Sequence, residues 1–268
     1  MDVPNFSQQK SDEEILREIL AKHNLSISDF RVYWCSPILI DEFSQPLWYM
    51  IEDNKVKMLR ISSEGLTHLD LSRLTNLEKL NLIECNITDL SLSNLPPNLK
   101  ELDLSENNLT RVDLSGLPNL KKLSLYGNKG LTQIDLSRLP NLEELDLIEC
   151  NITDLSLSKL PPNLKWIKLS ENKGLTRVDL SGLTNLEKLY LAWCNITDLS
   201  LSKLPPNLKE IDLSENEGLT QVDLSGLTNL EKLDLGGCKN LKEIILSKDV
   251  KDKISITGDV DKINIIWK

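Results

Sequence analysis

The segment that decides the fold reads LEELDLIECNITDLSLSKLPPN, from Leu142 to Asn163. Its first half follows the phrase LxxLxLxx(N/C)xL, which recurs along the chain every 21 or 22 residues. The first residue of the phrase falls at Val56, Leu77, Leu99, Leu120, Leu142, Leu164, Leu186, Leu208 and Leu230. A single unit of this length cannot bury its own leucines, so the copies must stack on one another. The period therefore predicts a solenoid of nine repeats over residues 56–246.

The alternation LxLxL inside each phrase is typical of a β-strand. Stacked copies would pair these strands into one parallel sheet. We expect the strands near residues 57–61, 78–82, 100–104, 121–125, 143–147, 165–169, 187–191, 209–213 and 231–235. The return path carries Asp-Leu-Ser turns and Pro-Pro-Asn, which disfavours helix. It therefore predicts a convex side of short extended segments and 3₁₀ turns.

The phrase LxxLxLxxNxL followed by LTxVDLSxLxNL resembles bacterial leucine-rich repeat proteins, particularly the short-repeat class sometimes called IRREKO. Residues 195–216, NITDLSLSKLPPNLKEIDLSEN, also resemble internalin repeats, and residues 95–107, LPPNLKELDLSEN, are similar to repeats of some secreted bacterial effectors. The resemblance covers about 190 of the 268 residues. It implies a leucine-rich-repeat solenoid with a parallel β-sheet on the concave face, which binds through its surface rather than catalysing a reaction.

The two ends depart from the repeat. Residues 11–22, SDEEILREILAK, combine a Ser cap, acids in the first turn and one apolar face, which predicts a short amphipathic helix. Strand-like segments follow over residues 30–61, so residues 1–55 are expected to form an N-terminal cap of helix and strands. Residues 247–268 contain KISI and KINIIW, which we expect to close the sheet as one or two strands.

The net charge limits which classes of molecule the protein is expected to bind. The net charge is −10 and the pI is near 4.9, which argues against nucleic acid and favours a protein partner with a basic surface. No apolar run reaches the roughly 18 residues of a membrane span. The N-terminus lacks a basic region followed by an apolar run, so we expect a cytoplasmic protein, with signal-less export left open. We expect a monomer, although the sequence does not fix the oligomeric state.

Four of the five cysteines share the ninth position of the repeat phrase, which Asn fills in other repeats. They are Cys85, Cys150, Cys194 and Cys238. Repeats stack about 4.8 Å apart, and no two of these cysteines lie in adjacent repeats. They are therefore too far apart for a disulfide or a shared metal ion, and we expect buried, reduced thiols and no metal or other cofactor.

Candidate binding residues lie at the third, fifth, seventh and eighth positions, which vary between repeats and should point outward from the strands. All four aromatic residues of the repeat region fall there. They predict an exposed hot spot on the concave face. The predicted site comprises Tyr126, Ile148, Trp166, Lys168, Tyr190 and Trp193, rimmed by Asp103, Asp146, Asp212 and Asp234.

Two classes of function stay open from the sequence. One is a protein-binding module, such as an adaptor or effector, that uses the concave face. The other is a structural or assembly solenoid without a ligand on that face. No phosphate-binding loop, dinucleotide-binding glycine motif, zinc-protease or nucleophile-elbow motif occurs in the sequence, so we expect no enzyme.

Overall fold

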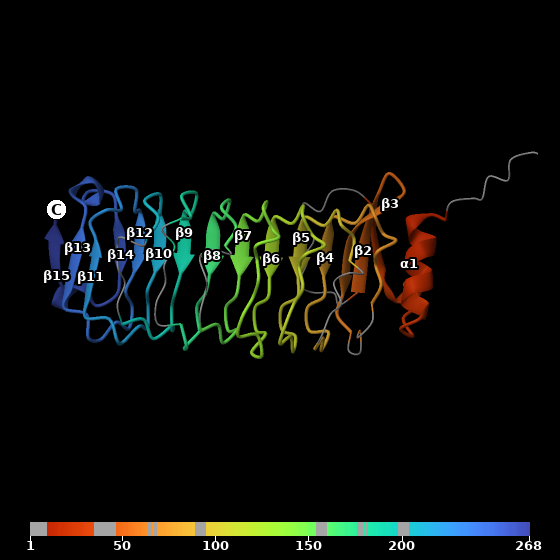
Figure 1. Cartoon of the computed structure of the whole chain (residues 1–268), viewed down its shortest axis with the longest axis horizontal. Coiled ribbons are helices and arrows are strands. Elements are labelled where there is room, and N and C mark those ends of the chain that lie inside the picture. Colours follow the sequence, from red (N-terminus) through yellow and green to blue (C-terminus); the bar gives the residue numbers. More distant parts are fainter. Residues whose placement is uncertain are drawn as a thin grey trace, which may run out of the picture.

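Short strands from β1 to β15 stack side by side and build an elongated body (Figure 1). The computed structural model describes residues 10–34, 47–63, 66, 69–88, 95–153, 160–175, 180, 182–197 and 204–268. The helix α1 lies at one end of this body and the strand β15 at the other (Figure 1). In the described part of the chain, no helix is both long and apolar enough to cross a membrane.

The predicted helix is confirmed as α1, Asp12–Ala21. The Ser11 hydroxyl accepts a hydrogen bond from the Glu14 backbone N–H, and the Glu14 carboxylate accepts one from the Ser11 N–H, which completes a capping box. The apolar face of α1 is buried in the core and packs against the strand β3 (Lys55–Ile61). A 3₁₀ turn, η1 (Ile27–Asp29), follows.

One sheet of twelve strands runs through the molecule, in the order β1-β2-β3-β4-β5-β6-β7-β8-β9-β10-β12-β14. Its strands besides β3 are β1 (Arg31–Trp34), β2 (Leu47–Glu52), β4 (Lys79–Asn81), β5 (Glu101–Asp103), β6 (Lys122–Ser124), β7 (Glu144–Asp146), β8 (Trp166–Lys168), β9 (Lys188–Tyr190), β10 (Glu210–Asp212), β12 (Lys232–Asp234) and β14 (Ser255–Thr257). Among the strands that the structure describes, only β2 and β3 pair antiparallel. The nine repeat strands, β3 to β10 and β12, are parallel in register, as predicted.

Most repeat strands are shorter than predicted. From β4 onward, each repeat strand of this sheet has three residues rather than five. The reason is an early turn, because the residue at the eighth position takes a positive φ in every repeat from β4 to β12. That backbone conformation ends the extended run and sends the chain toward the return path.

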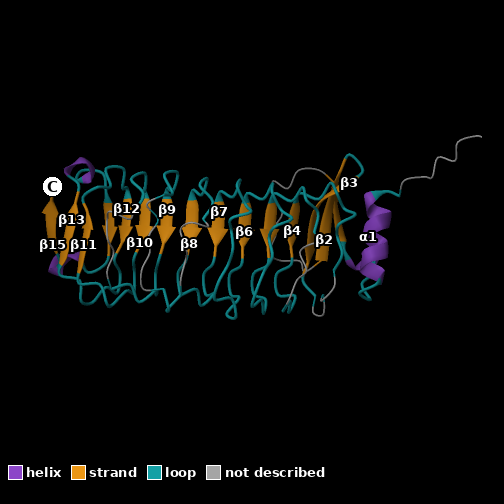
Figure 2. Ribbon diagram, in the orientation of Figure 1, coloured by secondary structure: helices purple, strands orange, loops and turns teal. Residues whose placement is uncertain are grey.

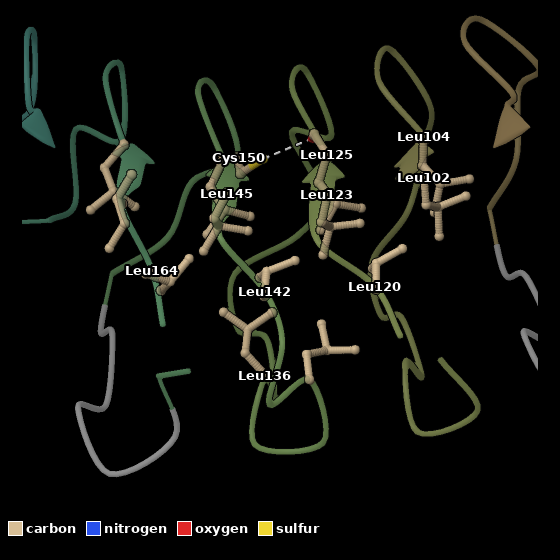
Figure 3. Packing of buried hydrophobic residues seen from close by; sticks show 14 of the residues in the cluster. Leu102, Leu104, Leu120, Leu123, Leu125, Leu136, Leu142, Leu145, Cys150 and Leu164 are labelled. Atoms are coloured by element: carbon tan, nitrogen blue, oxygen red, sulfur yellow. Dashed lines mark hydrogen bonds between the residues drawn. The ribbon is translucent and has the colours of Figure 1, made fainter. Parts of the chain in front are cut away.

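The core lies between the sheet and the return path and is almost entirely aliphatic. Leu145, at the middle of β7, stacks on Leu123 of the previous repeat, and the leucines of successive repeats continue this column (Figure 3). One cluster of buried side chains extends without a break from Leu16 in α1 to Val250 near the C-terminal end. This continuous core does not mark where a cap ends and the repeats begin. The division into residues 1–55, 56–246 and 247–268 therefore stays a prediction.

The ninth position explains how Asn and Cys can replace each other. The amide of Asn172 donates to the carbonyls of Leu147 and Leu169 and accepts from the Ile152 N–H at 2.7 Å. Cys150, in the equivalent slot, has one weak donor in place of the amide, and its thiol donates to the Leu125 carbonyl at 3.1 Å (Figure 3). The predicted burial of all four ninth-position cysteines is confirmed.

A second, three-stranded parallel sheet was not predicted. It consists of β11 (Gln221–Leu224), β13 (Glu243–Leu246) and β15 (Asn264–Trp267) at the C-terminal end of the body (Figure 2). The 3₁₀ turns η5 (Lys248–Val250) and η6 (Val260–Lys262) connect these elements. The β-branched residues Ile244, Ile245 and Ile265 favour strand in β13 and β15. β11 keeps the Asp-Leu-Ser sequence of the return path and is extended where it pairs with β13.

Candidate functional site on the sheet face

Each three-residue strand presents two side chains to one side of the sheet, which we call the sheet face. In β7, Leu145 is buried while Glu144 and Asp146 point the other way and are half-buried. The same alternation holds for the other repeat strands from β4 on. The third and fifth positions of the repeat therefore form two columns across the sheet face, as the sequence predicts.

Trp166 is an exposed large hydrophobic side chain on these columns. It begins β8, is 37% exposed, and lies with the Lys188 ammonium 4.6 Å from its ring centroid. The register places Lys168 of β8 directly beside Tyr190 of β9. Tyr190 is half-buried, and burial together with a hydrogen bond to Glu210 raises its pKa to about 12. β8 and β9 thus bring two aromatic rings and two ammonium groups together.

The other predicted aromatic residues lie in turns rather than on strands, which corrects the sequence interpretation. Tyr126 follows the end of β6 by two residues and Trp193 follows the end of β9 by three. Tyr126 bonds the Glu106 carboxylate, which raises the pKa of its hydroxyl. Ile148, just after β7, is half-buried. These residues form a second row along the edge where the strands end.

Trp193 is unusual in this row. It has φ 58° and is 51% exposed. The left-handed backbone region suits Gly and disfavours bulky residues. In the other repeats from β4 to β12, the eighth position is held by Glu84, Glu106, Gly127, Glu149, Glu171, Glu215 and Gly237. Trp193 is therefore flanked by Glu171 and Glu215 in the neighbouring repeats. We use the term aromatic patch for Tyr126, Ile148, Trp166, Lys168, Tyr190 and Trp193.

The four predicted rim acids have a structural role that the sequence analysis missed. Asp146 accepts a hydrogen bond from the backbone N–H two residues on, at Ile148, and forms an ion pair with Lys168 at 2.9 Å. Asp103, Asp212 and Asp234 accept the equivalent backbone bond. Each carboxylate thus caps the turn after its own strand. The Asp-Leu-Ser spacing at Asp103 and Asp212, already interpreted as a turn on the return path, carried this signal.

Lysine and glutamate alternate from repeat to repeat and pair across the strands. On the third position, Lys79 pairs with Glu101 at 3.0 Å and Lys122 with Glu144 at 3.0 Å. On the second position, Glu78 pairs with the lysines of both neighbouring repeats. Partly exposed pairs of this kind contribute at most about 1 kcal/mol each. Their main effect is to neutralise the middle of the sheet face.

A groove of about 330 Å³ runs over the sheet face from β2 to β8. Three residues at its N-terminal end were not predicted as site residues: Trp48, Met58 and Arg60. Trp48, Met50 and Met58 form a small buried cluster separate from the main core. Arg60 lies at the fifth position but is only 6% exposed. The antiparallel pairing of β2 with β3 creates this arrangement, and the repeat pattern alone could not reveal it.

Comparison with known families agrees with this architecture. A model described as "Leucine Rich repeats (2 copies)" matches residues 97–139, and one described as "Leucine rich repeat" matches residues 140–196. The chain is a leucine-rich repeat protein with repeats of about 22 residues. Leucine-rich repeat domains are typically protein-interaction modules, and the fold is generally non-catalytic. None of the curated proteins searched matches the sequence.

Solved structures from bacteria share the fold. An internalin (inlF) from Listeria monocytogenes is 26% identical, with a TM-score of 0.55 over 75% of this chain and 66% of its own. The functional domain of InlJ from Listeria monocytogenes, described as including a cysteine ladder, is 20% identical. Its TM-score is 0.52, and the match covers 96% of this chain and 69% of the InlJ chain. The leucine-rich repeat domain of the type III effector XopL is 18% identical, with a TM-score of 0.55 over 98% and 86%. This chain therefore spans just under two thirds of the inlF chain.

Proposed function

We propose that this protein binds a protein partner through its sheet face, with the aromatic patch at the centre of the contact. The observation that carries the proposal is the exposure of Trp166 and Trp193, at 37% and 51%. Among the described residues, the only other large hydrophobic side chain that is exposed is Val32. Exposed Trp and Tyr residues are the side chains enriched in binding hot spots.

The charges around the patch support a partner with basic side chains. Trp193 lies between Glu171 and Glu215 in the column of eighth positions. An arginine of the partner could stack on the indole while its guanidinium pairs with either carboxylate. The net charge of −10 would add long-range attraction for such a partner. Lys168 and Asp146 already form an ion pair with each other. They would therefore help to orient the bound partner more than to attract it.

We further propose a non-catalytic, cofactor-free monomer that acts in the cytoplasm. The paired charge ladder supports this view, because its lysines and glutamates are held by one another rather than presented to a substrate. The alternative, an assembly solenoid, would associate with copies of itself and leave the aromatic patch uncovered.

The experiment that tests the proposal compares the wild-type protein with the double variant Trp166→Ala/Trp193→Ala in quantitative affinity capture. A matched control, Thr110→Ala/Thr184→Ala, changes two exposed residues that lie on the return path. The proposal requires a captured partner whose recovery falls in the tryptophan variant and not in the control. Equal recovery in all three, or self-association that the tryptophan variant retains, would overturn it.

A further inference from the structure

Arg60 is buried on the sheet face, where charged residues are otherwise partly exposed. It occupies the fifth position of β3, and its direct cross-strand neighbour is Trp48 of β2. Met50 and Met58 form the adjacent pair on the same two strands and are also buried. Arg60 and Trp48 line the N-terminal end of the groove, so the guanidinium lies against an apolar wall.

Arg60 also lacks the pairing that its neighbours have. Its Nε is buried without a hydrogen-bond partner, and among the described residues no carboxylate forms an ion pair with it. The next residue in its column, Asn81, donates to Asp103 at 3.1 Å and accepts the Ile83 N–H at 3.1 Å. Asp103, the first carboxylate in the column, lies two strands from Arg60, about 10 Å by strand spacing.

Two other charged groups that line the groove already have partners. Lys79, the closest cation along the groove, pairs with Glu101 at 3.0 Å. Asp103 accepts the Ser105 N–H at 3.0 Å as well as the Asn81 amide. A buried charge without a partner is strongly unfavourable and is rare in native proteins. A buried guanidinium open to a groove therefore indicates a missing anionic group.

We propose that Arg60 anchors a carboxylate carried by an extended segment of the protein partner, with an apolar side chain of that segment packed against Trp48 and Met58. This inference rests on the proposed function and adds a second contact at the N-terminal end of the same groove. A single guanidinium matches a carboxylate in a two-bond fork. Phosphate fits less well, because Glu101 and Asp103 would face its second charge without a free cation.

The test titrates N-acetyl-leucinate, a carboxylate with an apolar side chain, into the ¹⁵N-labelled protein and follows the Arg60 Nε–H and the amides of β3 and β4 by NMR. We expect saturable shifts confined to these groups, and no such shifts with the neutral N-acetyl-leucinamide. Inorganic phosphate should bind at least tenfold more weakly. A peptide with a free C-terminal leucine and an amidated peptide with an internal Glu-Leu then distinguish the two sources of carboxylate.

Three variants complete the design. Arg60→Met should lower the affinity for N-acetyl-leucinate at least tenfold, while Arg111→Met, at an exposed arginine of the return path, should not change it. Arg60→Lys keeps the charge but not the fork and should bind at an intermediate level; it also serves if the methionine variant fails to fold. Trp193→Ala should bind N-acetyl-leucinate as the wild type does, because Trp193 lies outside this site. The titration therefore tests the Arg60 site separately from the proposed role of the aromatic patch. No saturable shift in the wild type, or unchanged binding in Arg60→Met, would overturn the proposal.

Discussion

The ammonium of Lys188 lies 4.6 Å from the ring centroid of Trp166, and the same nitrogen lies 3.4 Å from the Glu210 carboxylate. These contacts join β8, β9 and β10 across the sheet face without involving the core. A cation–π contact at an exposed site contributes about 0.5–1 kcal/mol. Trp166 is therefore held in place by a charged neighbour while more than a third of its surface faces solvent.

The first prediction concerns stability at this position. Trp166→Ala should lower the free energy of unfolding by about 1 kcal/mol or less, because the ring lies outside the buried core and its contact with Lys188 is exposed. The adjacent Ile167 is fully buried, so Ile167→Ala should lower it by about 2–5 kcal/mol. Urea unfolding of both variants checks the difference. If the tryptophan variant is as unstable as the isoleucine variant, the ring belongs to the core and the assigned register is wrong.

The second prediction concerns the ninth position. Asn172→Leu removes the acceptor for the Ile152 N–H and the donor to two carbonyls, and each buried group left unpaired costs about 1–3 kcal/mol. Asn172→Cys should be less damaging, because a thiol in this slot still donates to a carbonyl of the preceding repeat, as Cys150 does. Asn163→Leu, at an exposed site, is the control. Equal stability of the Leu and Cys variants would contradict the assigned role of the amide.

The third prediction concerns thiol reactivity. Burial raises the pKa of Cys150 and Cys194 to about 12 and that of Cys85 to about 11, so almost no reactive thiolate is present at neutral pH. Labelling of these cysteines by a thiol reagent should be slow in the folded protein and rapid in urea. Mass spectrometry of the labelled peptides gives the rate at each site. Rapid native labelling at any of the three would show that the stack is open there.

The fourth prediction follows from the same raised pKa values. An unfolded thiol loses its proton near pH 8.5, whereas the folded thiols keep theirs to about pH 11 or 12. The unfolded state therefore binds fewer protons above pH 8.5, and stability should fall by about 1.4 kcal/mol per pH unit for each such thiol. Below pH 8.5 these groups should have no effect. Urea unfolding between pH 7 and pH 10.5 tests this, and a Cys150→Ala/Cys194→Ala variant should show a shallower decline.

The repeat period was sufficient to predict the solenoid. A leucine at the centre of every strand, as at Leu123 and Leu145, can be buried only if the repeats stack on one another. It could not predict where each strand ends. That depends on the positive φ at residues such as Glu149, which the spacing of leucines does not encode. Aromatic residues after the strand, such as Tyr126, were consequently assigned to strands.

The sequence could predict the site residues only where their surroundings are set by the repeat itself. Trp166 and Tyr190 occupy third and fifth positions, and the structure places them on the sheet face as expected. Arg60 occupies a fifth position too, but β2 pairs antiparallel with its strand and brings Trp48 beside it. Burial of Arg60 thus arises from a cap that has no counterpart in the repeats, so internal comparison of the copies could not reveal it.

Binding of a protein partner by the aromatic patch can be measured as the affinity of one captured partner for the purified wild-type and variant proteins. Surface plasmon resonance should show Trp193→Ala weakening binding roughly thirtyfold, or about 2 kcal/mol, with most of the change in the dissociation rate. Thr184→Ala, on the return path, should leave the affinity unchanged. If Trp193→Ala and Trp166→Ala both bind the partner as tightly as the wild type, the sheet face is not the binding surface.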